Sequence, residues 1–167
     1  MDVRPFISSL LVSALVACNS TPTQEALPTL SPSLTQTVPA EALNPDVRQE
    51  TIHQTICVSG YTASVRPSTI YTNSVKRKLM RQQSLPTTAA AYFELDHHVP
   101  LALGGHPRNL QNLMLQPWEG DGGAKKKDRL ERKLQMLVCA DKVMLDDARR
   151  AIWFDWQGAY RRYVSAP

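Results

Sequence analysis

The chain has 167 residues, of which 20% are charged and 43% hydrophobic, so it is long enough for one ordinary domain with additional segments. The formal net charge is +4, but it is unevenly distributed. Residues 51–167 hold 17 basic and 10 acidic residues (+7), whereas residues 18–50 hold one Arg and four acids (−3). A basic domain behind an acidic leader favours a polyanion as partner. The chain has no CxxC pair, which argues against a structural zinc site built from cysteines.

Residues 1–17 have the pattern of a lipoprotein signal peptide. Arg4 provides a positive charge, and the apolar run that follows is about twelve residues long, too short to span a bilayer. The run ends in LVAC, so we expect Cys18 to be acylated and to anchor the protein to a membrane. By resemblance to Gram-negative lipoproteins, Asn19 indicates the outer membrane of the bacterial envelope. The alternatives are an ordinary cleaved secretory signal and an apolar N-terminus without a targeting role.

Residues 18–50 are rich in Pro, Ser, Thr and Gln and contain no aromatic residue. This composition predicts a disordered tether, and the folded domain is expected to occupy residues 51–167. The β-branched residues of segment 51–61 predict a strand. A helix is expected to follow within residues 65–83, capped by Thr72 or Asn73.

The second half of the chain predicts two short strands followed by two helices, an α+β fold. The first strand lies within residues 87–105, where Pro100 limits its length, and the second lies within 109–117. A helix over 124–139 has apolar residues at a spacing of three or four, and so has a last helix over 146–164. The apolar residues in question are Leu130, Leu134, Leu137 and Val138, then Ala148, Ile152, Trp156, Tyr160 and Tyr163. We interpret the aromatic residues as core rather than as a platform for stacking bases.

Two cysteines remain if Cys18 carries lipid. Cys57 and Cys139 are 139 − 57 = 82 residues apart, and a cysteine pair in an exported chain favours a disulfide. Closing such a loop would stabilise the fold by about 4–5 kcal/mol in the chain-entropy model. Two separate buried thiols are the alternative.

Three of the four histidines fall within YFELDHHVPLALGGHPRNLQNLMLQP, residues 92–117. Hydrolysis of a phosphodiester needs a base that activates water and a cation beside the phosphate. The adjacent Asp96 and His97 offer a metal ligand and a base. Neighbouring residues on a strand point to opposite faces, but Pro100 and the Gly104–Gly105 turn give reason for a local bend.

The motif ELDHHVPLALGG…NLQNL followed by KKKDRLE resembles the HNH endonuclease family. ICVSGYTASVRP and VCADKVMLDDARRAI are similar to an exported or phage-associated branch of HNH-like proteins, so the resemblance spans Ile56 to Tyr160. It implies a ββα-metal core with flanking helices and a hydrolase that cuts DNA with little sequence specificity, with RNA as a further substrate. It also implies one divalent metal ion, with Mg²⁺ favoured over Mn²⁺, Ni²⁺ or Zn²⁺, and we expect no protein partner.

Carried over by position, the resemblance makes His97 the general base and Asp96 a metal ligand. Asn109 would fix the loop and orient the base. Where the family usually has a third His or Asn ligand, this chain has Lys125, which has no lone pair to offer a metal.

Three interpretations of this departure remain open. Asp121 or Asp128 could replace the missing ligand, or Asp96 alone could hold Mg²⁺ together with water and substrate phosphate. Alternatively, the site is degenerate, and the protein is a non-catalytic nucleic-acid-binding lipoprotein. A protein of another class, an envelope interaction protein with a structural histidine cluster, is a further alternative.

The remaining polar residues of this region have weaker assignments. His98 is interpreted as a packing residue, with a second metal ligand as the alternative, and His106 as a loop histidine. Lys125–Lys127 lie at the predicted start of a helix, where positive charge opposes the helix dipole unless a phosphate binds there. These lysines and Arg108 are therefore the candidate nucleic-acid contacts, the alternative being a solvated surface run.

Overall fold

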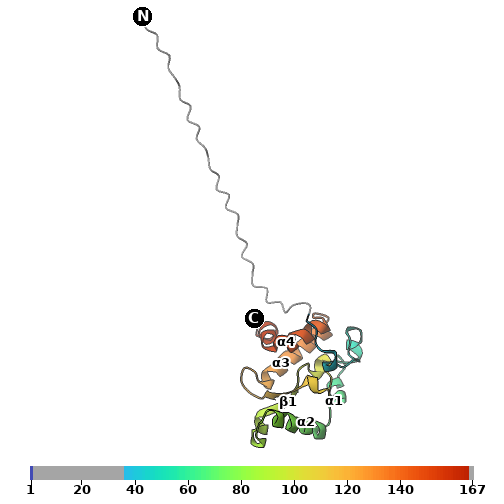
Figure 1. Cartoon of the computed structure of the whole chain (residues 1–167). Helices are drawn as coiled ribbons and strands as arrows, with labels where there is room; N and C mark the ends of the chain where they lie inside the picture. Colours follow the sequence, from blue (N-terminus) through green and yellow to red (C-terminus); the bar gives the residue numbers. More distant parts are fainter. Residues whose placement is uncertain (2–35, 166–167) are drawn as a thin grey trace. The chain divides into compact units, whose positions relative to one another are not determined.

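The computed structural model describes Met1 and residues 36–165 (Figure 1). The predicted signal peptide beyond Met1, the lipidation site Cys18 and the tether as far as residue 35 lie outside the described residues. The domain is a mixture of helices and a two-stranded antiparallel sheet, as an α+β fold requires. Its main elements are α1 (Tyr61–Val65), α2 (Thr69–Gln82), β1 (Phe93–His97), β2 (Leu113–Pro117), α3 (Ala124–Cys139) and α4 (Leu145–Tyr163).

The sheet is a single hairpin with a long connection. β1 and β2 pair in a register that runs from Phe93 opposite Pro117 to His97 opposite Leu113. The connecting loop contains two short 3₁₀ helices, η4 (Leu101–Leu103) and η5 (Leu110–Asn112). β1 ends three residues before Pro100, which confirms the short first strand, and α3 follows the hairpin in the chain.

The core lies mainly between α3 and α4, which pack against each other. Leu130, Leu134 and Val138 of α3 are fully buried because their spacing of four residues places them on one face. α4 contributes a matching stripe, in which Ala148 and Ile152 are buried. Both helices were predicted from this periodicity.

Two local predictions in the first half of the domain are wrong. Segment 51–61 forms no strand but a 3₁₀ helix, η2 (Gln49–Gln54), followed by turns. Ile52 and Ile56 are both buried, at a helical spacing of four, and Cys57 N–H donates to the Ile52 carbonyl. α2 begins at Thr69 rather than near Thr72, because the Ser68 side chain accepts a hydrogen bond from Tyr71 N–H.

The folded part begins earlier than residue 51. Ala42 and Val47 are buried although they lie within the predicted tether. The Arg149 guanidinium of α4 donates to the Val47 carbonyl (2.9 Å) and to the Leu103 carbonyl (2.8 Å). The composition of this stretch did not reveal its order, because its partner is an arginine about a hundred residues away in the chain.

The disulfide between Cys57 and Cys139 is present, with 5.6 Å between the two Cα atoms. It joins the turn after η2 to the last residue of α3. In the part of the chain that the structure describes, no helix combines the length and the apolar character that crossing a bilayer would need.

Candidate functional site

His97 is the last residue of β1, and its imidazole is almost completely buried. Nε2 lies 3.2 Å from the carbonyl oxygen of Pro107. A carbonyl oxygen can only accept, so we assign the ring proton to Nε2, which leaves a lone pair on Nδ1. Burial lowers the pKa of His97, against the opposing effects of the Pro107 hydrogen bond and Asp96. The ring is therefore neutral at physiological pH, the state in which imidazole acts as a base.

Asp96 is engaged on both carboxylate oxygens. Oδ1 accepts the backbone N–H of His97 (2.7 Å), and Oδ2 accepts from the Lys127 ammonium of α3 (2.9 Å). Lys127 is 1% exposed and also donates to the His97 carbonyl oxygen (2.7 Å) and to Glu131. We call these three residues the Asp96–Lys127–Glu131 cluster.

Charges within and around this cluster alter its titration. Burial alone would lower the pKa of Lys127, but the carboxylates of Glu131 and Asp96 outweigh it and raise that pKa. Burial raises the pKa of Glu131 despite the neighbouring ammonium. Burial, together with the carboxylates of Asp96, Asp128 and Glu131, raises the pKa of Glu94 to about 7. The raised pKa of Lys127 favours its ammonium form, and two neighbouring carboxyl groups, Glu131 and Glu94, bind a proton more readily than usual.

The predicted metal ligands are not brought together. The His98 ring packs against Trp153, with 4.9 Å between ring centroids, and exposed Asp121 accepts from Lys126 (3.0 Å). Among residues 36–165, no group of three or more His, Cys, Asp or Glu side chains could hold a metal ion. With an ammonium already on Asp96, the residues present do not fit a metal ion held by this carboxylate.

Asn112, rather than Asn109, holds the loop that follows β1. The Asn109 side chain accepts only a local hydrogen bond from Gln111 N–H (3.0 Å) at the start of η5. The fully buried Asn112 side chain donates to the carbonyls of Val99 (3.0 Å) and His106 (3.1 Å) and accepts from Val99 N–H (2.8 Å). The sequence NLQNL contains two Asn-Leu pairs, and the role predicted for Asn109 in the first pair belongs to Asn112 in the second.

The three lysines of the predicted phosphate contact do not form one exposed run. Lys125 pairs with Glu119 and Lys126 pairs with Asp121 at the surface. The side chain of Lys127 points into the protein, so its predicted contact with nucleic acid is wrong. The contacts predicted for Lys125 and Lys126 stay predictions.

Two arginines, Arg66 and Arg108, are connected to the surroundings of His97 in different ways. The exposed Arg108 guanidinium lies 5.1 Å from the centroid of the Tyr71 ring, and the Tyr71 hydroxyl donates to the Arg108 carbonyl (2.7 Å). Arg108 directly follows Pro107, the residue that holds the His97 ring. Arg66, which ends α1, lies close enough for its charge to lower the pKa of His97 further, after the larger effect of burial.

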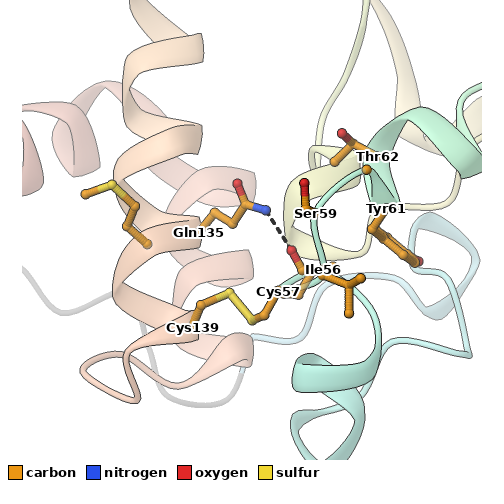
Figure 2. A pocket seen from close by; sticks show the side chains of 10 residues that line it. Ile56, Cys57, Ser59, Tyr61, Thr62, Gln135 and Cys139 are labelled. Carbon is orange, nitrogen blue, oxygen red and sulfur yellow. Dashed lines mark hydrogen bonds between the residues drawn. A yellow bond between two sulfur atoms is a disulfide. The ribbon is translucent and has the colours of Figure 1, made fainter.

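A pocket of about 330 Å³ lies elsewhere, between the segment that follows η2 and the C-terminal half of α3 (Figure 2). The disulfide lines it, together with Tyr61 and Gln135, and Gln135 donates to the Ile56 carbonyl (2.7 Å). Neither Asp96 nor His97 contributes to this pocket. No family model, curated protein or solved structure matches the chain.

Proposed function

We propose that the protein hydrolyses phosphodiester bonds in nucleic acid, with His97 as the general base. The observation that carries the proposal is the placement of this imidazole: Nε2 contacts the Pro107 carbonyl, which leaves the lone pair on Nδ1, and burial lowers the pKa of the ring and so favours its neutral form. Such a group can take a proton from a water molecule as the water oxygen attacks phosphorus and the leaving oxygen departs. The order strand, strand, helix around His97 supports the proposed likeness to HNH endonucleases.

DNA is the proposed substrate, with RNA as a further one. The excess of 17 basic over 10 acidic residues in positions 51–167 favours a polyanion. The charge of Arg66 acts on His97, and Arg108 directly follows Pro107, which contacts the ring, so both arginines are candidates to bind the phosphate. Nothing in the sequence indicates an appended module that reads bases, so we propose cleavage with little sequence specificity. The predicted lipid anchor supports an action at the bacterial cell envelope.

We assign no step to the divalent metal ion that the resemblance implies, because Lys127 already occupies Asp96. The same ion pair favours a second candidate function, a nucleic-acid-binding lipoprotein that does not cut. The two candidates share the excess of basic residues and differ only in the use of His97.

The test uses the oxidised chain from Asn19 onward, which retains the buried residues before position 51. Supercoiled plasmid is incubated with this protein in Mg²⁺, Mn²⁺, Ni²⁺ or Zn²⁺ and separately in EDTA. We compare the wild type with His97→Gln, whose amide can still donate to Pro107 but cannot act as a base. Exposed His53, paired with Asp141 away from the site, provides the control His53→Gln.

We expect nicking by the wild type and the control, and a loss of about 100-fold or more in His97→Gln. Salt-dependent DNA binding without nicking, from protein shown to be folded, would support the second candidate instead. Equal nicking by His97→Gln and the wild type would refute the role of His97.

A further inference from the structure

The Lys127 ammonium lies beside Asp96, where a bound cation would lie, and each of its N–H groups has an acceptor. It extends from the first turns of α3 to the end of β1, and its three N–H bonds have three acceptors: Asp96 Oδ2, the His97 carbonyl and Glu131. Its side chain is 1% exposed, so water does not compete for these bonds. A buried charge this well paired is stable in place, whereas removing one partner leaves the others uncompensated.

The cluster holds both backbone polar groups of His97. Asp96 Oδ1 accepts the His97 N–H, and Lys127 donates to the His97 carbonyl. Lys127 also donates to the other oxygen of Asp96. The lysine therefore holds the carboxylate in place, and the carboxylate in turn holds the backbone N–H of His97. With Nε2 held by Pro107, the residue is constrained at three atoms, and two of these constraints depend on Lys127.

Lys127 also fills the position at which a helix residue would be expected to complete a metal site. The sequence register places the third ligand of the HNH-like pattern near Lys125, and the residue of α3 that reaches Asp96 lies two positions later. A divalent cation on Asp96 would lie beside this ammonium and be repelled by it. To bind there, it would have to displace Lys127 from its three acceptors.

We propose that Lys127 takes the place of a metal ion at this site: its ammonium neutralises Asp96 and positions His97. Lys127 is thus a positioning residue and not a catalytic one. The consequence for activity, cleavage without a divalent ion bound to Asp96, rests on the proposed function. The consequences for the histidine ring and for metal binding do not.

The test uses ¹⁵N-labelled oxidised protein from Asn19 onward. Long-range ¹H–¹⁵N spectra report which ring nitrogen of His97 carries the proton, and Mn²⁺ added to the sample broadens the signals of residues near a bound ion. The variants are Lys127→Met, which removes the charge, and Lys127→Arg, which retains it. Lys133→Met is the matched control, an exposed lysine on the same helix.

In the wild type and in Lys133→Met we expect a single Nε2–H tautomer of His97 and no selective broadening by Mn²⁺. Lys127→Met should mix the two tautomers, and its freed Asp96 should make the signals of residues 96 to 98 sensitive to Mn²⁺. Lys127→Arg should restore the single tautomer at least in part. If Lys127→Met does not fold, the wild-type Mn²⁺ titration and Lys127→Arg still decide the question.

Selective broadening of residues 96 to 98 in the wild type at micromolar Mn²⁺ would overturn the proposal. An unchanged tautomer in folded Lys127→Met would overturn it as well. Where the plasmid assay detects nicking by the wild type, we expect that nicking to persist in EDTA. In Lys127→Met we expect the rate of nicking to fall about 100-fold, because the His97 ring would no longer be held in position. Absence of nicking under all conditions refutes the proposed function and leaves the spectroscopic test of Lys127 intact.

Discussion

The two ends of α3 are attached to the rest of the domain by different kinds of interaction. Near its N-terminal end, Lys127 holds the end of β1 through charge and hydrogen bonds. At its C-terminal end, Cys139 is bonded to Cys57, and Gln135 adds a hydrogen bond to the Ile56 carbonyl (Figure 2). The first attachment depends on the balance of charges, and the second depends on the redox state of two sulfurs.

The two attachments of α3 have different effects, because one mainly stabilises the fold and the other mainly fixes the positions of side chains. A disulfide stabilises a fold mainly by restricting the unfolded chain. A buried ion cluster contributes little net stability, because desolvation offsets the attraction, but it fixes the positions of the groups that it joins. The end of α3 that contacts the candidate site is therefore the end that fixes geometry, and the opposite end supplies much of the stability.

Removing the covalent attachment should have the largest effect. We expect Cys57→Ala/Cys139→Ala to lower the free energy of unfolding by about 4–5 kcal/mol, because the bond closes a loop between residues 82 apart. Urea denaturation measures the change in the free energy of unfolding. The wild type with its disulfide reduced should show the same loss as the double variant. The His97 ring should keep its tautomer, and a change there would show that the two ends are not independent.

Removing the ammonium should be nearly as costly. Lys127→Met leaves two carboxyl groups buried without their partner, and we expect a loss of about 3–5 kcal/mol in the free energy of unfolding. Adding Glu131→Gln should recover part of this loss, because it removes one uncompensated charge. Lys133→Met should change stability by less than about 0.5 kcal/mol. A loss of that small size in Lys127→Met would contradict the burial of the cluster.

The loop beside the cluster should depend on neutral hydrogen bonds. Asn112→Ala leaves the buried polar groups of Val99 and His106 without partners, and we expect a loss of about 2–3 kcal/mol. Asn109→Ala removes only a local cap and should cost about 0.5–1 kcal/mol. Thermal unfolding of the two variants compares them directly, and a larger effect at Asn109 would reverse the assignment.

The stability that the N-terminal end of α3 and its surroundings contribute should depend on pH, whereas that of the disulfide should not. The pKa of Glu94 is raised from 4.5 to about 7 in the folded state, so the folded protein binds this proton more tightly than the unfolded chain does. Its contribution to stability is present at pH 4.5 and is lost as the pH rises through 7. We expect Glu94→Gln to flatten this dependence by about 1–2 kcal/mol, allowing for partial solvent exposure.

Melting temperatures at pH 5 and pH 8 measure this difference, with Glu119→Gln at the surface as the control. Glu94→Gln should lose less stability than the wild type between the two values. An identical pH dependence in both proteins would mean that Glu94 is ionised in the folded state at pH 5. The disulfide should contribute equally at both values.

The sequence predicted what depends on periodicity and on short spacing. The α3 helix was predicted with its observed bounds, because its apolar residues recur every three or four positions. The two strands and the disulfide were predicted as well. The 3₁₀ helix of residues 49–54 was missed because its β-branched residues favour a strand, whereas the spacing of Ile52 and Ile56 decided the structure.

Contacts between distant parts of the chain could not be read from the sequence. Lys127 lies in a run of three lysines that resembles a surface patch, and its partner Asp96 lies 31 residues earlier. Only the direction of its side chain, which reaches the end of β1, separates its role from those of Lys125 and Lys126. In the same way, the order of the segment around Val47 depends on Arg149, which is 102 residues later.

The contact between His98 and Trp153 gives the molecule an optical indicator beside the candidate site. Their ring centroids are 4.9 Å apart, and burial, followed by the charge of Lys127, lowers the pKa of His98. A protonated imidazole quenches indole fluorescence, whereas a neutral one quenches it weakly. With the other two tryptophans replaced by Phe, emission should fall as the pH drops below this lowered pKa. Fluorescence intensity would then report the protonation of the residue next to His97 in the same cuvette in which nucleic acid is added.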